Sequence, residues 1–334
     1  MKILIVQTAF IGDVILITPL IRAIKKHFSA ALLDIIVVPQ TADLLQNNPH
    51  INSTIIFDKK KNKLLSFFSI LKTLRSEKYD IAFLTHSSST SALLTLLAGI
   101  PVRVGFDRWL SRKFLTKRVK HIPNVFKIEK YLNLLSPYTS EKSSIQTELF
   151  PTVELIDKAK QITSNLKSKT KKLIAVAPGS VWFTKRWPEE YFAELVTKLT
   201  KDNFGIIFIG SKEESDICER IQPESNSINL AGELSLLESA AIVNECDLMI
   251  CNDSGAMHIA NAMKTDVLAF FGPTVKKIGY FPFRTSDIVL ERNLDCRPCG
   301  SHGADKCPLG HFECMKLIKP DYVSKVIQNK FTEN

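Results

Sequence analysis

Two apolar runs, residues 247–251 and 266–271, have the length and composition of strands buried in a parallel sheet. The turn between them contains the polar residues Asn252, Asp253 and Ser254 and the small residue Gly255. A helix is expected to follow at residues 256–263. The unpaired N–H groups at the start of such a helix favour an anion, most simply a diphosphate.

His258 lies four residues after Ser254, so both side chains would face the same ligand. Gly255 has no Cβ, which would let a ligand approach the backbone closely. The alternative is an ordinary capped helix that carries a surface histidine.

Strands alternate with helices along the first half of the chain. The expected strands span residues 2–8, 32–38, 54–57, 79–85 and 102–105. The expected helices span residues 41–47, 63–76 and 90–98, and a further one ends near residue 28. That helix either begins at Thr18 and Pro19 or starts at Asp13 and is kinked by Pro19. The alternation predicts a parallel sheet covered on both faces.

A second series begins beyond polar stretches at residues 140–147 and 167–172, which flank an expected helix at 153–166. Its further strands are expected at residues 173–177, 205–209 and 228–230, and its further helices at 189–201, 213–221 and 236–244. We therefore predict an α/β protein of two Rossmann-like domains, residues 1–160 and 161–334, with parallel sheets facing across a cleft. The second domain would include a cysteine-rich segment, 296–314, and a final helix.

Ligands of open α/β sheets collect at the carboxyl ends of the strands. In the second half the turns at these ends are residues 178–180, 210–213, 231–233 and 252–255. Each contains Gly, Ser or both, which suits a phosphate and a ribose. Lys185 follows the first turn closely and would be a point charge for phosphate, or else a solvated surface lysine.

The turn after the first strand lacks the glycine pattern of dinucleotide-binding enzymes, and the chain has no phosphate-binding loop of the usual ATPase type. The turn offers Gly12 and Asp13 instead. A carboxylate at this strand end could act as a general base for a hydroxyl nucleophile. The alternative is that Asp13 only caps the following helix.

The length of 334 residues allows two domains, and a composition of 45% hydrophobic and 23% charged residues is that of a soluble globular protein. Polar residues and a proline interrupt the most apolar N-terminal stretch, residues 3–21. We therefore expect neither a transmembrane helix nor a signal peptide.

The net charge of +10 belongs to the first half of the chain. Residues 1–160 carry 23 Lys and Arg against 12 Asp and Glu, whereas residues 161–334 carry 21 against 22. Blocks at 59–78 and 103–130 supply the excess, which suggests a polyanion or an anionic membrane surface as partner. Nucleic acid would fit the charge equally well. However, no helix-turn-helix, RNP-like or zinc-finger pattern supports a nucleic-acid partner.

The seven cysteines divide into two sets. Cys218, Cys246 and Cys251 lie in apolar contexts and are expected to be buried thiols. The others form a block that also holds His302 and His311: Cys296, Cys299, Cys307 and Cys314. Four thiolates, with either histidine as substitute, could bind zinc, but the spacing of six between the last two is wider than usual. Without a secretory signal, a disulfide framework is the weaker interpretation.

Five blocks of the sequence occur together in one known family. They are KILIVQTAFIGDVILITPLIRAIKKHF at the N-terminus, APGSVWFTKRWPEEYFAEL in the centre, NDSGAMHIANA, FFGPT and the cysteine block with CPLGH. In these blocks the chain resembles the ADP-heptose:lipopolysaccharide heptosyltransferases of glycosyltransferase family 9, most closely the heptosyltransferase II branch. The resemblance spans nearly the whole chain and is weakest between residues 59 and 150.

The resemblance implies the GT-B architecture and an inverting, metal-independent transfer of heptose from ADP-heptose, with no cofactor. The cysteine block comes with the resemblance, without implying a catalytic metal. Asp13 matches the family's catalytic aspartate. Charge growing on the leaving phosphate would be met by Lys185, Ser180 and the N–H groups at Ser254 and Gly255.

The resemblance also places further residues at the donor site. Asp253 would bond the heptose hydroxyls or hold the turn, and His258 would help to bind the phosphates or the sugar. Glu213, Glu233 and Leu234 match positions near the ribose and adenine.

The implied acceptor is a lipid A that carries Kdo and heptose, reached at the cytoplasmic face of the inner membrane. This acceptor is polyanionic, which fits the basic first half. The expected acceptor-binding residues are Gly12, His86, Ser87, Arg103, Arg108 and Arg112. Two alternatives stay open: a transferase of the same family with another nucleotide sugar or acceptor, and a non-catalytic binding protein on the same scaffold.

Overall fold

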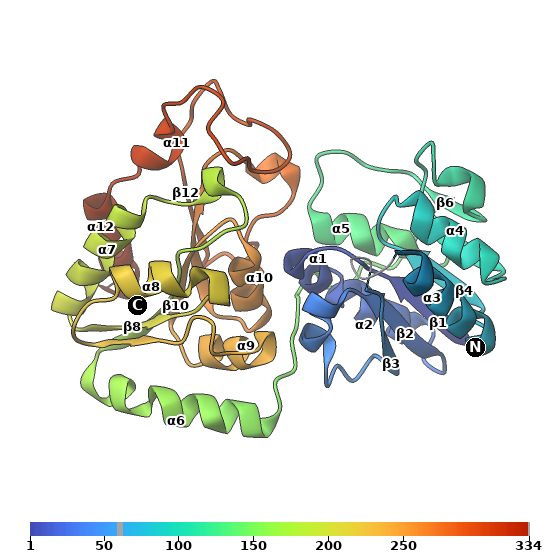
Figure 1. Ribbon diagram of the computed structural model, residues 1–334, viewed down its shortest axis with the longest axis horizontal. Helices are drawn as coiled ribbons and strands as arrows, with labels where there is room; N and C mark the ends of the chain where they lie inside the picture. The colour runs from blue at the N-terminus through green and yellow to red at the C-terminus, as the bar shows by residue number, and fades with distance from the viewer. Residues whose placement is uncertain (59–62, 333–334) are drawn as a thin grey trace. The chain divides into compact units, whose positions relative to one another are not determined.

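A computed structural model describes residues 1–58 and 63–332, and the chain forms two α/β units, residues 1–150 and 151–334 (Figure 1). The first residues of the basic block at 59–78 lie outside the described residues. The division falls between Phe150 and Pro151 rather than after residue 160. Helix α6 (Val153–Lys169) belongs to the second unit because it packs against α9 (Leu236–Asn244), where Lys158 pairs with Glu238 at 2.6 Å.

The first unit is built on a six-stranded parallel sheet in the order β3-β2-β1-β4-β5-β6. Its strands are β1 (Lys2–Val6), β2 (Leu32–Val37), β3 (Ser53–Ile56), β4 (Ile81–Leu84), β5 (Val102–Phe106) and β6 (Lys117–Val119). Its α-helices are α1 (Ile11–Leu16), α2 (Thr18–His27), α3 (Lys63–Glu77), α4 (Ser89–Leu97) and α5 (Lys127–Leu132). Leu4 and Val6 face the cluster made with α3 and α4, while Ile3 and Ile5 point to the other face and are equally buried. This confirms a parallel sheet buried on both faces.

The second unit repeats this plan with the strand order β12-β11-β10-β7-β8-β9. Its strands are β7 (Lys172–Ala177), β8 (Phe204–Phe208), β9 (Ser227–Asn229), β10 (Leu248–Asn252), β11 (Asp266–Phe271) and β12 (Ile288–Glu291). Its further helices are α7 (Glu189–Lys201), α8 (Ser215–Ile221), α10 (Gly255–Ala262), α11 (Glu313–Lys316) and α12 (Pro320–Thr332). Trp187 organises the core: its ring stacks on Phe270 at 4.3 Å, and its Nε1 donates to the carbonyl of Ile318 at 2.9 Å.

In each sheet the order in which successive strands are added reverses at one place, the switch point. It lies between β1 and β4 in the first unit and between β7 and β10 in the second. The loops leaving two such neighbouring strands run to opposite faces of the sheet and leave a crevice at its carboxyl edge. These two points are therefore where each unit is expected to bind a ligand.

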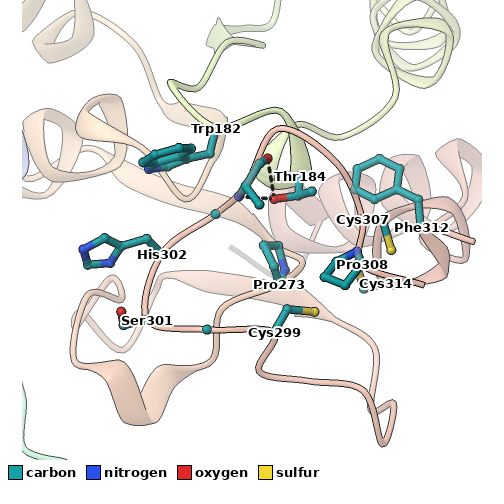
Figure 2. A pocket seen from close by; sticks show the side chains of 13 residues that line it. Trp182, Thr184, Pro273, Cys299, Ser301, His302, Cys307, Pro308, Phe312 and Cys314 are labelled. Atoms are coloured by element: carbon teal, nitrogen blue, oxygen red, sulfur yellow. Dashed lines mark hydrogen bonds between the residues drawn. The ribbon is translucent and has the colours of Figure 1, made fainter. Parts of the chain in front are cut away.

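Cys296, Cys299 and Cys307 lie in the segment that connects β12 to α11, and Cys314 belongs to α11 itself. The segment passes close to Pro273, just after β11 (Figure 2). The N–H of Cys299 donates to the carbonyl of Pro273 at 3.0 Å. The N–H of Thr184 donates to Ala304 at 3.0 Å. The block is thus part of the edge at which the turns of the second unit meet.

Several local expectations differ from the structure. The helix that ends near residue 28 begins at Thr18 with Pro19 in its first turn, as the first alternative expected, but a separate short helix, α1, precedes it. Pro19 has no N–H to donate to the carbonyl of Ile15, and the Thr18 hydroxyl donates to this carbonyl instead at 2.8 Å. The helix expected at 41–47 is instead two 3₁₀ turns, Pro39–Thr41 and Asp43–Leu45. The sequence also did not predict β6, β12 or α5.

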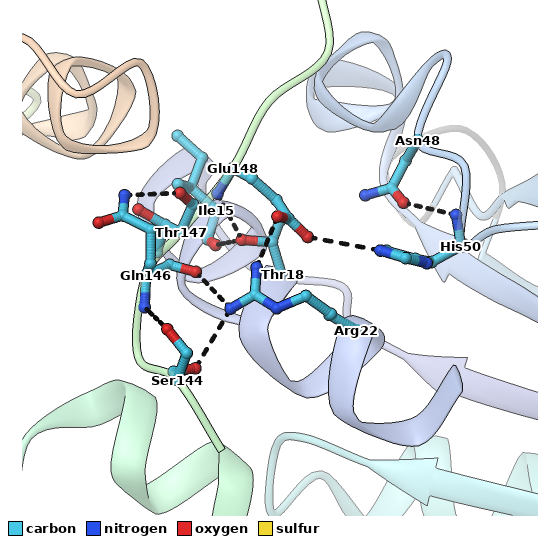
Figure 3. Close-up of polar contacts among 9 residues, drawn as sticks. All are labelled: Ile15, Thr18, Arg22, Asn48, His50, Ser144, Gln146, Thr147 and Glu148. Carbon is cyan, nitrogen blue, oxygen red and sulfur yellow. Dashed lines mark hydrogen bonds and ion pairs between the residues drawn. The ribbon is translucent and has the colours of Figure 1, made fainter. Parts of the chain in front are cut away.

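Arg22 of α2 holds the chain segment that leaves the first unit (Figure 3). Its guanidinium pairs with Glu148 at 2.5 Å and donates to the carbonyls of Gln146 at 2.9 Å and Ser144 at 3.3 Å. Thr18 adds a further contact by accepting from the N–H of Glu148 at 3.1 Å. In the described part of the chain, no helix is both long and apolar enough to cross a bilayer.

Replacing Arg22 with alanine is expected to lower the free energy of unfolding by about 2 kcal/mol, because a half-buried pair and two carbonyl bonds are lost together. Urea unfolding measures this change. Lys26→Ala is the matched control: it breaks an exposed pair with Glu141 on the same segment and should change stability little. Equal losses in both variants would contradict the anchoring role of Arg22.

Candidate functional site

Asp13 lies at the switch point of the first unit, in the first turn of α1, and is only 6% exposed. The helix begins after Phe10, and the Asp13 carboxylate is contacted from α5. The Tyr131 hydroxyl donates to its Oδ1 at 2.6 Å, and the Lys127 Nζ lies 3.7 Å from the same atom. The carboxylate is therefore held in place by side chains as an ion-paired acceptor, and it does more than cap a helix.

Lys127, which pairs with Asp13, has further cationic side chains beside it. Burial lowers the pKa of Lys127, although Asp13 opposes this shift. Burial, with repulsion from Lys127 and Arg108, lowers the pKa of Lys130 to about 8. His121 accepts from both Lys130 and Arg108 at its Nε2, at 2.5 and 3.0 Å, and burial and these cations lower its pKa.

Sequence reasoning missed Lys127, Lys130, Tyr131 and His121. A signal was present: Lys127 and Tyr131 stand four residues apart and share a helix face. Their approach to Asp13 depends on tertiary packing, because the two segments are far apart in the chain.

The other expected acceptor residues divide into two groups. His86 and Ser87 follow β4 directly, and the His86 ring lies 6.4 Å from that of Tyr131. Gly12 precedes Asp13 in α1, so these residues gather at one sheet edge. Arg103 instead donates to the carbonyls of Phe114 at 2.6 Å and Ile100 at 2.5 Å, as a backbone brace.

Of the remaining two arginines, Arg112 is exposed and pairs with Asp107 at 3.3 Å, whereas Arg108 belongs to the cationic group beside Asp13. Arg108 therefore contacts His121 beside Lys130, whereas Arg103 and Arg112 make other contacts.

Asn252, at the end of β10, joins the turns at the switch point of the second unit. Its Nδ2 donates to the carbonyls of Pro178 at 2.7 Å and Gly179 at 3.2 Å, and its Oδ1 accepts from the N–H of Trp187 at 2.9 Å. One buried amide thus fixes the turn after β7 and the approach to α7. The sequence indicated Asn252 only as part of a polar turn.

Lys185 and Asp253 form an ion pair in this turn, with Nζ 2.6 Å from Oδ2. The Thr274 hydroxyl donates to the same oxygen at 2.7 Å. The Lys185 side chain is 14% exposed, so it is not a solvated surface lysine. The pair lines a small cavity shared with Tyr280 and Ser301.

Ser254 occupies the N-cap position of α10 in an extended conformation, although its hydroxyl makes no capping hydrogen bond. His258 is 4% exposed, and its ring lies 6.4 Å from that of Tyr280, so it is a buried rather than a surface histidine. Ser180 is buried too, and its carbonyl accepts from Arg186 Nε at 2.8 Å.

The turns after β8 and β9 carry the remaining expected donor residues. Glu213 and Glu233 are exposed, and Leu234 is half-buried. Glu214, the neighbour of Glu213, caps the turn by accepting from the Ser211 N–H at 2.8 Å. Glu214 also lies so close to Gly179 that a Cβ added to this glycine would be 1.7 Å from the Glu214 Oε1. The first three turns of this edge are therefore packed tightly against one another.

A larger cavity of about 340 Å³ lies beside the donor turns, under the cysteine block (Figure 2). Trp182, His302 and Phe312 line it together with Cys299, Cys307 and Cys314. Among residues 1–58 and 63–332, no group of three or more His, Cys, Asp or Glu is placed to hold a metal ion.

Burial favours the protonated thiol at two cysteines of the block. Burial raises the pKa of Cys314 to about 11 and also raises the pKa of Cys299. Arg297 anchors the segment by donating to the carbonyls of Phe271, Gly272 and Thr274. Cys218, Cys246 and Cys251 are buried, as expected.

Comparison with known proteins gives one consistent result. Residues 67–307 match the family model described as glycosyltransferase family 9 (heptosyltransferase). Lipooligosaccharide heptosyltransferase 2 of Campylobacter jejuni is 28% identical over 99% of this chain and 100% of its own length.

Two solved structures have the same fold. A family 9 glycosyl transferase from Veillonella parvula has a TM-score of 0.87 at 22% identity, covering 100% of this chain and 98% of that one. The ADP-heptose LPS heptosyltransferase II of Escherichia coli has a TM-score of 0.82 at 21% identity, covering 100% and 99%. The expected GT-B class of fold is confirmed.

Asn252→Ala should destabilise the second unit by about 2–4 kcal/mol, because it leaves a buried N–H and two buried carbonyls without their partner. Chemical denaturation followed by Trp fluorescence measures the loss. Asn244→Ala, an exposed asparagine at the end of α9, is the control and should change little. A neutral Asn252→Ala would show that these turns are held by other contacts.

Proposed function

The chain belongs to glycosyltransferase family 9, and we propose that it transfers heptose from ADP-heptose to the inner core of lipopolysaccharide with inversion at the anomeric carbon. The observation that carries this proposal is that groups suited to this reaction lie at the switch points of the two sheets. One switch point holds a buried carboxylate, and the other holds a lysine beside a helix N-terminus. The named substrates are those in the name of the E. coli neighbour.

Asp13 is proposed as the general base. It takes the proton of the acceptor hydroxyl while the hydroxyl oxygen bonds to the anomeric carbon of the heptose. The bond from that carbon to the β-phosphate oxygen breaks, and its electron pair leaves with ADP. Attack opposite to the leaving group inverts the configuration. The Tyr131 hydroxyl, 2.6 Å from Oδ1, would fix the carboxylate so that its other oxygen faces the acceptor.

The leaving ADP gains negative charge, which the second unit is proposed to neutralise. Lys185 supplies a full positive charge, and Ser180 and the N–H groups at Ser254 and Gly255 supply dipoles. Asp253 holds the Lys185 ammonium at 2.6 Å, which positions it before the donor arrives, and would also bond sugar hydroxyls. These donors are proposed to take the place of a metal ion at this step, and the loss of one such donor typically costs about 3 kcal/mol in the transition state.

The other donor contacts follow from the same arrangement. His258, beside Tyr280, is proposed to contact the phosphates or the sugar. Glu213, Glu233 and Leu234, on the turns after β8 and β9, are proposed to contact the ribose and adenine.

The acceptor is proposed to carry Kdo and heptose on lipid A, and the enzyme to work at the inner face of the cytoplasmic membrane. Exposed apolar side chains support this location. Leu64, Leu65 and Phe68 project from the start of α3, and Trp109 and Leu110 from the loop after β5. Both segments leave the carboxyl edge of the sheet, where Asp13 lies, and their neighbours Phe67 and Phe114 share one core. Exposed Arg112 and Lys113 accompany them, a combination that binds anionic bilayers.

The proposed activity is tested by incubating the protein with ADP-heptose and a heptose-bearing inner-core acceptor. The masses of the products are then measured by mass spectrometry. One added heptose is expected, with or without EDTA. If no product forms with any of a series of inner-core acceptors of increasing length, the protein uses a different nucleotide sugar or is a binding protein. Activity lost to EDTA and restored by a divalent ion would contradict the metal-independent step.

Asp13→Asn should lower kcat by about 10²–10⁴-fold, because the amide cannot accept the proton, while the Kd for ADP-heptose stays within about twofold. Single-turnover transfer and calorimetric titration measure the two effects. Unchanged transfer would remove Asp13 from the proposed role. Glu141→Gln, an exposed acid of the same unit, is the control.

Phe68→Ser combined with Trp109→Ser should reduce binding to vesicles of anionic phospholipid at least tenfold, because two exposed aromatic rings no longer enter the interface. Co-sedimentation measures this loss, and Leu309→Ser, an exposed site of the second unit, is the control. Transfer to a delipidated, soluble acceptor should be unaffected. Unchanged vesicle binding by the double variant would refute the assignment of this surface.

A further inference from the structure

The cations beside Asp13 come from three separate parts of the first unit. Lys127 and Lys130 belong to α5, Arg108 to the loop after β5, and His121 to the segment between β6 and α5. The Lys130 ammonium lies 2.5 Å and the Arg108 guanidinium 3.0 Å from the same atom, Nε2 of His121. Both are hydrogen-bond distances, so two positively charged donors share one neutral acceptor, the imidazole nitrogen.

This convergence is electrostatically unfavourable in the protein alone. The charged groups that act on Lys130 are Lys127 and Arg108, which repel it, and Asp13, which attracts it. Those that act on His121 are Lys130, Arg108 and Lys127, all of which oppose its protonation. Asp13 already has Lys127 at 3.7 Å, so it does not account for Lys130 and Arg108.

The side chains are nevertheless held in position. Phe106, the last residue of β5, lies under the Lys130 ammonium at 5.3 Å, and its ring contacts that of His121 edge-on at 6.0 Å. An aromatic ring under a lysine ammonium attracts the ammonium by a cation–π interaction and so helps to fix its position. Phe106 of β5 thus supports both Lys130 of α5 and His121, and Arg108 joins them from the loop after β5.

We propose that Lys130, Arg108 and His121 form an anion subsite that binds a carboxylate or phosphate of the acceptor next to the hydroxyl that Asp13 deprotonates. This inference rests on the proposed function and specifies how the acceptor is oriented. An anion between Lys130 and Arg108 satisfies both cations by charge-assisted hydrogen bonds. It also fixes the distance from the anionic group of the acceptor to the attacking oxygen, with Lys127 between the two sites.

The subsite should lose affinity in alkaline solution. Lys130 has a pKa of about 8, so its ammonium is present below that pH and is lost as the pH rises through it. Acceptor binding should therefore weaken between pH 7 and pH 9, whereas donor binding at the other unit should not follow this profile.

The test uses the full-length protein without donor. A soluble, delipidated inner-core oligosaccharide is titrated by calorimetry in three forms: intact, with its carboxylates reduced, and with its phosphates removed. Lys130→Gln should raise the Kd for the intact form about tenfold or more at pH 7, and the wild-type affinity should fall to a similar level at pH 9. The modified form that loses the same affinity identifies the anion. Lys142→Gln, an exposed lysine, is the control.

A second measurement separates this inference from the proposed function. The imidazole proton signal of His121, assigned with His121→Gln, should shift on addition of inorganic phosphate to the wild type and not to Lys130→Gln. If the phosphate response is present but no heptose is transferred, the subsite stands and the proposed function fails. If heptose is transferred while Lys130→Gln changes neither the Kd, the pH profile nor the His121 response, the subsite is refuted.

Discussion

A charge can be kept out of water only beside a compensating charge or hydrogen bonds, and this constraint determines the surroundings of Asp13 in the first unit and of Lys185 in the second. Asp13 is buried at one switch point because Tyr131 and Lys127 contact it. Lys185 is largely buried at the other because the Asp253 carboxylate compensates its charge, and Thr274 in turn donates to that carboxylate. Each reactive group is therefore positioned by its partners before any substrate is present, which is the condition for electrostatic catalysis.

The same constraint explains why the two pairs have different surroundings. Lys185 and Asp253 are close to neutral together, so an incoming diphosphate must draw the ammonium towards itself, and the N–H groups of the turn supply the remaining attraction. Around Asp13 the balance is positive, with Lys127, Lys130 and Arg108 nearby. In the proposed function, the surroundings of Lys185 would suit a nucleotide that leaves after each turnover, and those of Asp13 would suit a strongly anionic acceptor.

Much of the fold could be predicted from the sequence, because buried parallel strands and capped helices leave strong local patterns. The helices Glu189–Lys201 and Leu236–Asn244 and the strand Asp266–Phe271 have the expected bounds. The edge strands Lys117–Val119 and Ile288–Glu291 and the short helix Lys127–Leu132 were missed, since so few residues carry no periodic signal. For the site, strand ends indicated Asp13, Lys185 and Asp253. The pairing of Lys185 with Asp253, and the contacts of Tyr131, Lys130 and His121, depend on tertiary packing that residue spacing does not encode.

Trp187 links the donor turn to the end of the chain, since its backbone N–H binds Asn252 and its indole N–H binds the carbonyl of Ile318. During synthesis on a ribosome, Ile318 emerges 131 residues after Trp187. The indole N–H therefore lacks this acceptor until that later part of the chain has been made. The contacts that join Trp187 to Asn252 and to Ile318 are complete only then.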